Sequence, residues 1–181
     1  MHKFLPKIFI FVEEYNSQIF KNNITNLGVI YRNYDSKNRE IELIKIAKEC
    51  KKKGWHLFIS NDIKLTFKFK AAGIYIPSFN RVKRFLNLEN KRLKILGSAH
   101  NQKEIHEKIK QKCKAIFLSP IFYSKKNKKI LGVHRFNYLA RSNKINFYAL
   151  GGINQTNTQM LNTLLISGMG GINIFKKKTG L

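Results

Sequence analysis

Short apolar runs alternate along this chain with longer segments in which apolar residues recur at the spacing of one helix face. Eight runs are rich in isoleucine, valine, phenylalanine and tyrosine and stop at glycine, proline or a polar residue, which is typical of buried strands. The predicted strands are 7–14, 27–34, 56–60, 73–76, 94–97, 115–118, 146–150 and 171–175.

The segments between these runs predict helices. The longest has Ser36 as its expected N-cap, carries Ile41, Ile44, Ala47 and Cys50 at helical spacing, and ends at Gly54. The other predicted helical segments are 16–26 (a short helix or loop), 62–70, 80–88, 101–112, 134–142 and 156–167.

Strict alternation of strand and helix predicts a parallel sheet with right-handed crossovers. Eight such units favour closure into a (β/α)8 TIM barrel, an α/β fold, forming a single domain over residues 1–181. Only residues 176–181 follow the last predicted strand, so the last helix is expected to be truncated or missing. An open doubly wound sheet is the alternative architecture.

The formal net charge of +25 suggests nucleic acid as a partner, because lysine releases counterions from phosphate backbones. However, the lysines are spread along the whole chain, together with abundant asparagine, isoleucine and phenylalanine, a bias typical of an A/T-rich genome. Arginine, which specific phosphate and base recognition favours, is the minority cation, and no nucleic-acid-binding motif is present. We therefore expect no specific nucleic-acid partner.

No apolar run is long enough to span a bilayer, and the run 8–12 is too short for a signal peptide, so a cytoplasmic protein without a membrane partner is expected. Cys50 and Cys113 lie far apart in predicted amphipathic helices and have no neighbouring histidine or cysteine pattern. They are predicted to be small packing residues rather than a disulfide or metal site.

Polar residues follow several predicted strands at the end where barrels of this type carry their active sites. Arg32 ends the second strand, Asn61 and Asp62 follow the third, and Ser98 and His100 follow the fifth. A cation, a carboxylate with an amide, and a histidine suit a phosphorylated or pyrophosphorylated substrate, with Mg²⁺ as an expected cofactor on Asp62. The plainer alternative is that Asn61-Asp62 caps a helix and that His100 has no chemical role.

Glycine and lysine supply a second candidate phosphate site at the same end. Gly151 and Gly152 follow the seventh strand, and glycine lets backbone N–H groups approach an anion closely. The loop after the sixth strand carries Lys126 and Lys128 within a basic run. A tight turn and a solvated loop are the structural alternatives for these two segments.

At this point the chain resembles the thiamine-phosphate synthase/TenI superfamily of (β/α)8 barrels, from about Leu27 to Phe175. The pieces that carry the resemblance are Gly97-Ser98-Ala99-His100, Ser119-Pro120-Ile121-Phe122, Leu131-Gly132 followed by Arg135-Phe136, Ala149-Leu150-Gly151-Gly152-Ile153 and Gly170-Gly171-Ile172. The synthase joins an aminopyrimidine diphosphate to a thiazole phosphate and releases pyrophosphate. The resemblance thus implies phosphorylated small-molecule substrates.

The resemblance also implies roles for individual residues. Arg32 would serve the pyrophosphate, together with Asn61 and Asp62, which would also hold Mg²⁺. Ser98 matches the family's serine after strand five. The thiazole phosphate would sit on the Gly151-Gly152 turn.

Other family positions differ in this sequence. The lysine of the family's strand-two pattern is Tyr34 here, and the second magnesium carboxylate, after strand four, falls at Asn80. The family's lysine after strand six aligns with Asn127, which Lys126 and Lys128 flank.

These features predict a thiamine-biosynthesis barrel of the synthase type. The alternative is a TenI-like thiazole tautomerase, in which His100 would act as acid and base, or a paralogue that binds thiazole phosphate without catalysis. A basic nucleic-acid binder is a third hypothesis. A homo-oligomer contact in place of the missing helix is left open.

Overall fold

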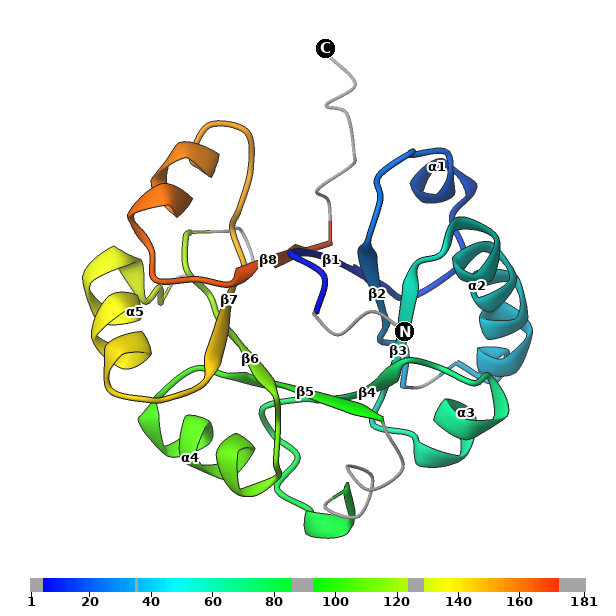
Figure 1. The fold of residues 1–181 in the computed structure, drawn as a ribbon, viewed down its shortest axis with the longest axis horizontal. Coiled ribbons are helices and arrows are strands. Elements are labelled where there is room, and N and C mark those ends of the chain that lie inside the picture. The colour runs from blue at the N-terminus through cyan, green and yellow to red at the C-terminus, as the bar shows by residue number, and fades with distance from the viewer. Residues whose placement is uncertain (1–4, 35, 86–92, 124–128, 173–181) are drawn as a thin grey trace.

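The computed structural model describes residues 5–34, 36–85, 93–123 and 129–172, which form a closed barrel of eight parallel strands (Figure 1). The strands are β1 (Ile8–Val12), β2 (Leu27–Tyr31), β3 (His56–Ser60), β4 (Gly73–Ile76), β5 (Lys94–Ala99), β6 (Ala115–Leu118), β7 (Asn146–Leu150) and β8 (Gly168–Gly171). The ring follows chain order, and β8 closes it by pairing with β1. The predicted fold class is confirmed.

Helices surround this ring of strands in Figure 1. They are α1 (Ser17–Phe20), α2 (Arg39–Lys53), α3 (Ile63–Lys68), α4 (Gln102–Lys110), α5 (Gly132–Arg141) and the 3-10 helix η2 (Thr158–Thr163). Within the described parts of the chain, no helix has the length and apolar character that crossing a membrane requires.

Aromatic rings fill the inside of the barrel. Phe9 meets Phe117 and Tyr148 edge to face, with ring centroids 5.2 Å apart in both pairs. Phe11 contacts Phe117 and Tyr75 in the same manner, and all five side chains are almost completely buried. The interior is therefore a packed core, and a ligand has room only at the mouth.

Glycines on β2 and β8 leave the space that these rings occupy. A Cβ on Gly28 would lie 2.2 Å from the Phe9 ring, and one on Gly170 would lie 3.0 Å from both the Phe11 and Phe117 rings. Strand β8 also passes close to the start of β1, where a Cβ on Gly168 would lie 2.0 Å from the Lys7 carbonyl oxygen. The barrel closes because these positions carry no side chain.

This packing corrects the predicted eighth strand. The strand was expected at 171–175, after the glycine cluster, but the glycines themselves form β8 at Gly168–Gly171, paired with β1 and β7. The positions 173–175, and the expected loss of a final helix, lie outside the described residues.

The predicted helix 156–167 is also wrong. Only the short 3-10 helix η2 forms, because nearby side chains take the backbone groups that an α-helix would use. The Asn154 side chain accepts the Thr156 N–H at 2.8 Å, and the Asn157 side chain accepts the Asn154 N–H at 2.9 Å. In the predicted segment 80–88, the described part contains only a 3-10 turn at 83–85.

The predicted face of α2 is wrong at its first two positions. Ile41 and Ile44 are 55% and 59% exposed, whereas Leu43, Ile46 and Cys50 are buried. Leu43 and Ile46 also have helical spacing, and contact with the sheet selects them in place of Ile41 and Ile44. Cys50 was expected on the buried face and is buried there. The helix begins two residues later than expected, with Asn38 in place of Ser36 as its N-cap residue.

The prediction for the cysteines is confirmed. Cys50 and Cys113 are free and buried, and each packs in a cluster between the sheet and the helices. Burial raises the pKa of both thiols to about 12, which makes them unreactive near neutral pH.

We predict that Gly168→Ala destabilises the barrel by at least about 2 kcal/mol, because the new methyl group would overlap the Lys7 carbonyl group and the Tyr148 ring. The matched control is Gly54→Asn at the end of α2, where φ is +64° and nothing lies within 4 Å of an added Cβ. Asparagine tolerates this conformation, so the control should lose less than about 1 kcal/mol. Urea unfolding measures both, and equal losses would contradict the close approach of β8 to β1.

Candidate active site at the mouth of the barrel

A cavity of about 450 Å³ opens at the carboxyl end of the barrel. Residues in or just after β1, β2, β4, β5, β6 and β7 line it. Three of the residues predicted from the sequence, Arg32, Ser98 and His100, meet in this wall. The barrel therefore brings together side chains that are distant in the sequence, at the end where such folds carry their active sites.

His100 is held from both sides of its ring. Its Nδ1 lies 2.6 Å from the carbonyl oxygen of Ser119, and its Nε2 lies 3.1 Å from the hydroxyl of Ser78. A carbonyl oxygen only accepts hydrogen bonds, so Nδ1 carries the hydrogen and neutral Nε2 presents a lone pair beside the cavity. This arrangement suits proton transfer to or from a bound ligand.

Arg32 stands across the cavity from these residues. Its backbone N–H donates to the Val12 carbonyl, and its Nη2 donates to Oε1 of Glu13 at 3.1 Å. The guanidinium also lies over the Phe11 ring, 5.7 Å from its centroid. Glu13 is 62% exposed, so the ion pair is weak, and an incoming anion can compete for Arg32.

Hydroxyl groups of tyrosine and serine lie in and near the lining of the same cavity. The Tyr34 hydroxyl lies 2.9 Å from Oγ of Ser60, and burial raises the pKa of Tyr34. Burial also raises the pKa of Tyr75, and a side-chain hydrogen bond to Ser98 opposes that rise. Both phenols therefore stay neutral at physiological pH and add no negative charge to the site.

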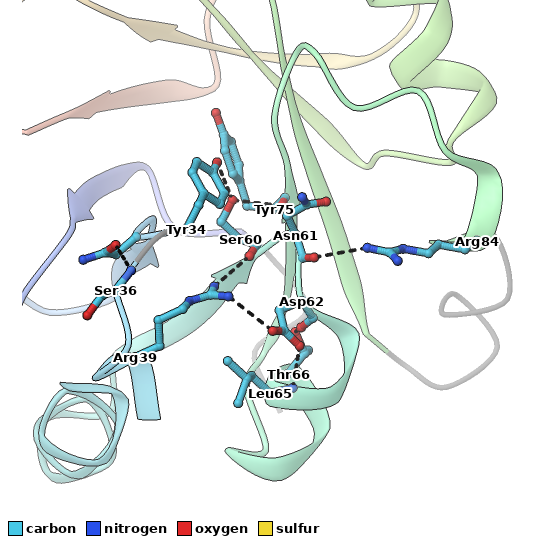
Figure 2. A network of polar contacts seen from close by, with 11 residues as sticks. Tyr34, Ser36, Arg39, Ser60, Asn61, Asp62, Leu65, Thr66, Tyr75 and Arg84 are labelled. Carbon is cyan, nitrogen blue, oxygen red and sulfur yellow. Dashed lines mark hydrogen bonds and ion pairs between the residues drawn. The ribbon is translucent and has the colours of Figure 1, made fainter. Parts of the chain in front are cut away.

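The turn after β3 carries the predicted Asn61 and Asp62 (Figure 2). Asn61 has φ of +60°, and its side-chain oxygen accepts a short hydrogen bond from the side-chain amide of Asn80. The side-chain oxygen of Asn80 in turn accepts the Val82 N–H at 2.8 Å. The structure thus brings Asn61 and Asn80 together as an amide pair.

Asp62 points away from this pair. Its Oδ1 accepts the Leu65 N–H at 2.9 Å and caps α3, and its Oδ2 lies 3.3 Å from Nη1 of Arg39, as Figure 2 shows. Arg39 also donates to the Ser60 carbonyl at 3.3 Å. Both carboxylate oxygens therefore have partners, and the structural role of an N-cap applies to Asp62.

The double glycine after β7 packs under the loop that follows β6. Gly151 and Gly152 have φ of +90° and +73°, and a Cβ on Gly152 would lie 2.2 Å from the Phe122 carbonyl oxygen. No described residue accepts a hydrogen bond from the backbone N–H of Gly152 or Ile153. Glycine is therefore required at this tight turn for steric reasons. The backbone N–H groups of Gly152 and Ile153 are available as donors to an anion. The predicted phosphate ligands Lys126 and Lys128 lie outside the described residues.

The sequence matches the family described as thiamine monophosphate synthase over residues 13–174. The chain belongs to the thiamine monophosphate synthase family. Two relatives named thiamine-phosphate synthase support this assignment. The one from Prochlorococcus marinus subsp. pastoris (strain CCMP1986 / NIES-2087 / MED4) is 30% identical over 138 residues, covering 72% of this chain and 38% of the relative. The one from Prochlorococcus marinus strain AS9601 is 33% identical over 129 residues, covering 66% and 35%.

A solved structure shows the same fold. Thiamine phosphate pyrophosphorylase from Pyrococcus furiosus superposes with a TM-score of 0.78 at 15% identity, covering 95% of this chain and 88% of that chain. The chain spans less than two fifths of the length of the two Prochlorococcus relatives.

The oxygens that the family resemblance offers to Mg²⁺ do not fit a magnesium site in this arrangement. Magnesium requires several oxygen ligands at about 2.0–2.1 Å in near-octahedral geometry. Here each side-chain oxygen of Asn61, Asp62 and Asn80 faces an N–H donor. No group of three or more histidine, cysteine, aspartate or glutamate residues able to hold a metal occurs in the described ranges.

Lys108 is a buried cation near the site that the sequence analysis did not identify. It lies on α4, is completely buried, and its Nζ donates to the Asn80 carbonyl at 2.6 Å and to Oε1 of Gln111 at 2.9 Å. Its stem passes Gly97, where a Cβ would lie 2.8 Å from Cδ of Lys108. The available signal was its place three residues after the buried Ile105, on the apolar face of α4.

We predict that Asp62→Ala lowers the free energy of unfolding by about 1–2 kcal/mol, because it removes both the N-cap of α3 and the partner of Arg39. Asp62→Asn keeps a capping oxygen and should lose clearly less. Urea unfolding with circular dichroism measures the three proteins. Equal loss in both variants would show that the ion pair, rather than the cap, is what matters.

The stability of the protein should also depend on Lys108 at alkaline pH. Burial lowers the pKa of Lys108 from its ordinary 10.5 to about 8, against smaller opposing effects of Cys113, Glu104 and Glu107; Arg81 adds to the lowering. Between these values the unfolded chain binds the lysine proton and the folded chain does not, so stability rises with pH. Relative to Lys108→Met, wild type should gain stability by on the order of 1 kcal/mol per pH unit from about pH 8 upward. Urea unfolding at several pH values tests this, and a constant difference would contradict the burial of a charged amine.

Proposed function

We propose that this chain catalyses a condensation of the thiamine-phosphate synthase type. An aminopyrimidine diphosphate loses pyrophosphate as the bond from its methylene carbon to the leaving oxygen breaks. The thiazole nitrogen of a thiazole phosphate then gives its lone pair to that carbon. The observation that carries this proposal is the cavity in which Arg32, Ser98 and His100 meet, in a barrel of this family.

The residues have distinct tasks in this reaction. Arg32 would neutralise charge that develops on the departing diphosphate, since its exposed partner Glu13 competes weakly for it. The amides of Gly152 and Ile153 would hold the thiazole phosphate across the mouth. Ser98 and the hydroxyls around it would orient the pyrimidine, because alignment of the two rings lowers the entropic barrier.

A TenI-like tautomerase is the second candidate, favoured by the geometry of His100. Its Nδ1 hydrogen bond to the Ser119 carbonyl fixes the tautomer, and Nε2, beside the Ser78 hydroxyl, would take up and return the proton. This function would use the amides of Gly152 and Ile153 to hold the thiazole phosphate and His100 to transfer the proton. It would need no diphosphate substrate.

We further propose a cytoplasmic location, supported by membership of the thiamine monophosphate synthase family. We also propose no nucleic-acid partner, supported by the even spread of lysine along the chain. Sedimentation of the purified protein would measure whether it forms a homo-oligomer in solution.

The first test supplies purified protein with both phosphorylated substrates and follows thiamine phosphate by chromatography. We expect product with wild type and a loss of about 100-fold or more in kcat/KM with Arg32→Gln, because Arg32 stabilises the leaving group. The matched control is Arg141→Gln on the outer side of α5, which should keep full activity. Absence of product from wild type, beside an active synthase, would refute the proposal.

The second candidate has its own test. Isomerisation of a thiazole carboxylate phosphate, followed by NMR, should fall about 100-fold or more in His100→Asn if the imidazole transfers the proton. Binding of the thiazole phosphate should persist in this variant. Isomerisation at the wild-type rate would remove His100 from that role.

A further inference from the structure

Positive charge gathers at the turn that the family resemblance assigns to the metal. Arg84 reaches from the segment after β4 and donates from Nη2 to the Asn61 carbonyl at 3.4 Å (Figure 2). Lys108 lies beneath the same turn, with Nζ 2.6 Å from the Asn80 carbonyl oxygen. Two cationic side chains therefore donate to the backbone carbonyls of the two residues that form the Asn61–Asn80 amide pair.

Neither cation forms a direct ion pair with a carboxylate of the described residues, although Glu104 and Glu107 act on the charge of Lys108 from a greater distance. Among the described residues, no aspartate or glutamate lies within 4.0 Å of the charged nitrogens of Arg84 or Lys108. The acceptors of Lys108 are neutral oxygens of Asn80 and Gln111. An anion at the Asn61–Asn80 turn would therefore meet positive charge, and the low polarity around buried Lys108 leaves the charge of Lys108 less screened.

The residues around Lys108 provide both the space for its buried side chain and support for the backbone to which it donates. The space for the Lys108 stem exists because position 97 is glycine, whose added Cβ would also lie 2.9 Å from Sγ of Cys113. Gln111 supports the same backbone by donating to the Asn80 carbonyl at 3.1 Å and to the Val82 carbonyl at 2.9 Å. Lys108 and Gln111 thus hold the segment after β4 at the backbone carbonyls of Asn80 and Val82.

The same turn lacks what a divalent cation needs. An asparagine stands where the family has a second carboxylate, and the carboxylate of Asp62 is turned to Arg39 and the α3 amide. A bound Mg²⁺ would also be repelled by the ammonium of Lys108 below it. The polar groups at this turn therefore favour an anion directly and disfavour a metal.

We propose, building on the proposed function, that this chain binds the diphosphate group without a divalent cation. Arg84 contacts the anion directly, and Lys108 supplies fixed positive charge from beneath the Asn61–Asn80 turn. The ligand class is a pyrophosphate or an organic diphosphate.

Isothermal titration of wild type with inorganic pyrophosphate, once in EDTA and once in excess MgCl₂, tests the proposal. We expect binding in EDTA, with an affinity that Mg²⁺ improves by no more than about threefold. Binding that appears only with Mg²⁺, or that tightens tenfold or more with it, would overturn the proposal. No binding under either condition would overturn it as well.

Variants identify the residues. Arg84→Ala should weaken pyrophosphate binding in EDTA about tenfold, the loss expected for one charge-assisted hydrogen bond, whereas Arg141→Ala on α5 should leave it unchanged. Lys108→Met should weaken it about threefold through the lost field, with a steeper effect at low salt. Because Lys108→Met changes a buried site, the folding of this variant is checked by circular dichroism. If Lys108→Met is unfolded, Arg84→Ala decides the proposal. Wild-type affinity in Arg84→Ala would refute the role of Arg84.

The two proposals can fail separately. Metal-free pyrophosphate binding without formation of thiamine phosphate would refute the proposed function and leave this inference standing. Formation of thiamine phosphate that strictly requires Mg²⁺ would support the proposed function and refute this inference.

Discussion

Closure of the barrel around a set of aromatic rings is the constraint on which the rest of the structure depends. Phe9, Phe11 and Phe117 fill the interior with edge-to-face contacts, so facing positions on β2 and β8 must carry no side chain. Once the ring of strands is closed, the ends of β2 and β5 lie around one cavity. Because aromatic side chains fill the interior of the barrel, a ligand has room only at the mouth, where these polar residues lie.

The loops at the mouth are held by specific hydrogen bonds rather than by regular secondary structure. Ser78, His100 and Ser119, which follow three successive strands, form one connected set through the histidine ring. Asn80 joins the turn after β3 to α4 through Asn61 and Lys108. Such connections fix the side chains that face a ligand before it binds, which is the condition for catalysis by alignment and fixed charge.

The two halves of the mouth differ in how far they keep the features of the thiamine monophosphate synthase family. The glycine turn after β7 has two residues with positive φ, and the ring of His100 has a hydrogen-bond partner at each nitrogen. At the opposite turn, amide pairing and an ion pair occupy the oxygens that a metal would need. Cationic side chains lie at this turn instead, which is consistent with a chain of strongly positive net charge.

The sequence by itself determined the fold class, the first seven strands and the position of Arg32, Ser98 and His100, because apolar runs of strand length and their polar ends are local signals. It did not determine β8, since a run of glycines becomes a strand only when the rings of Phe11 and Phe117 require the space. It misjudged α2, because Ile41 and Leu43 belong to alternative stripes of similar apolar character and only contact with the sheet chooses between them. The partners of Asp62 and the burial of Lys108 depend on residues brought together from different units of the barrel, so only the tertiary structure decided them.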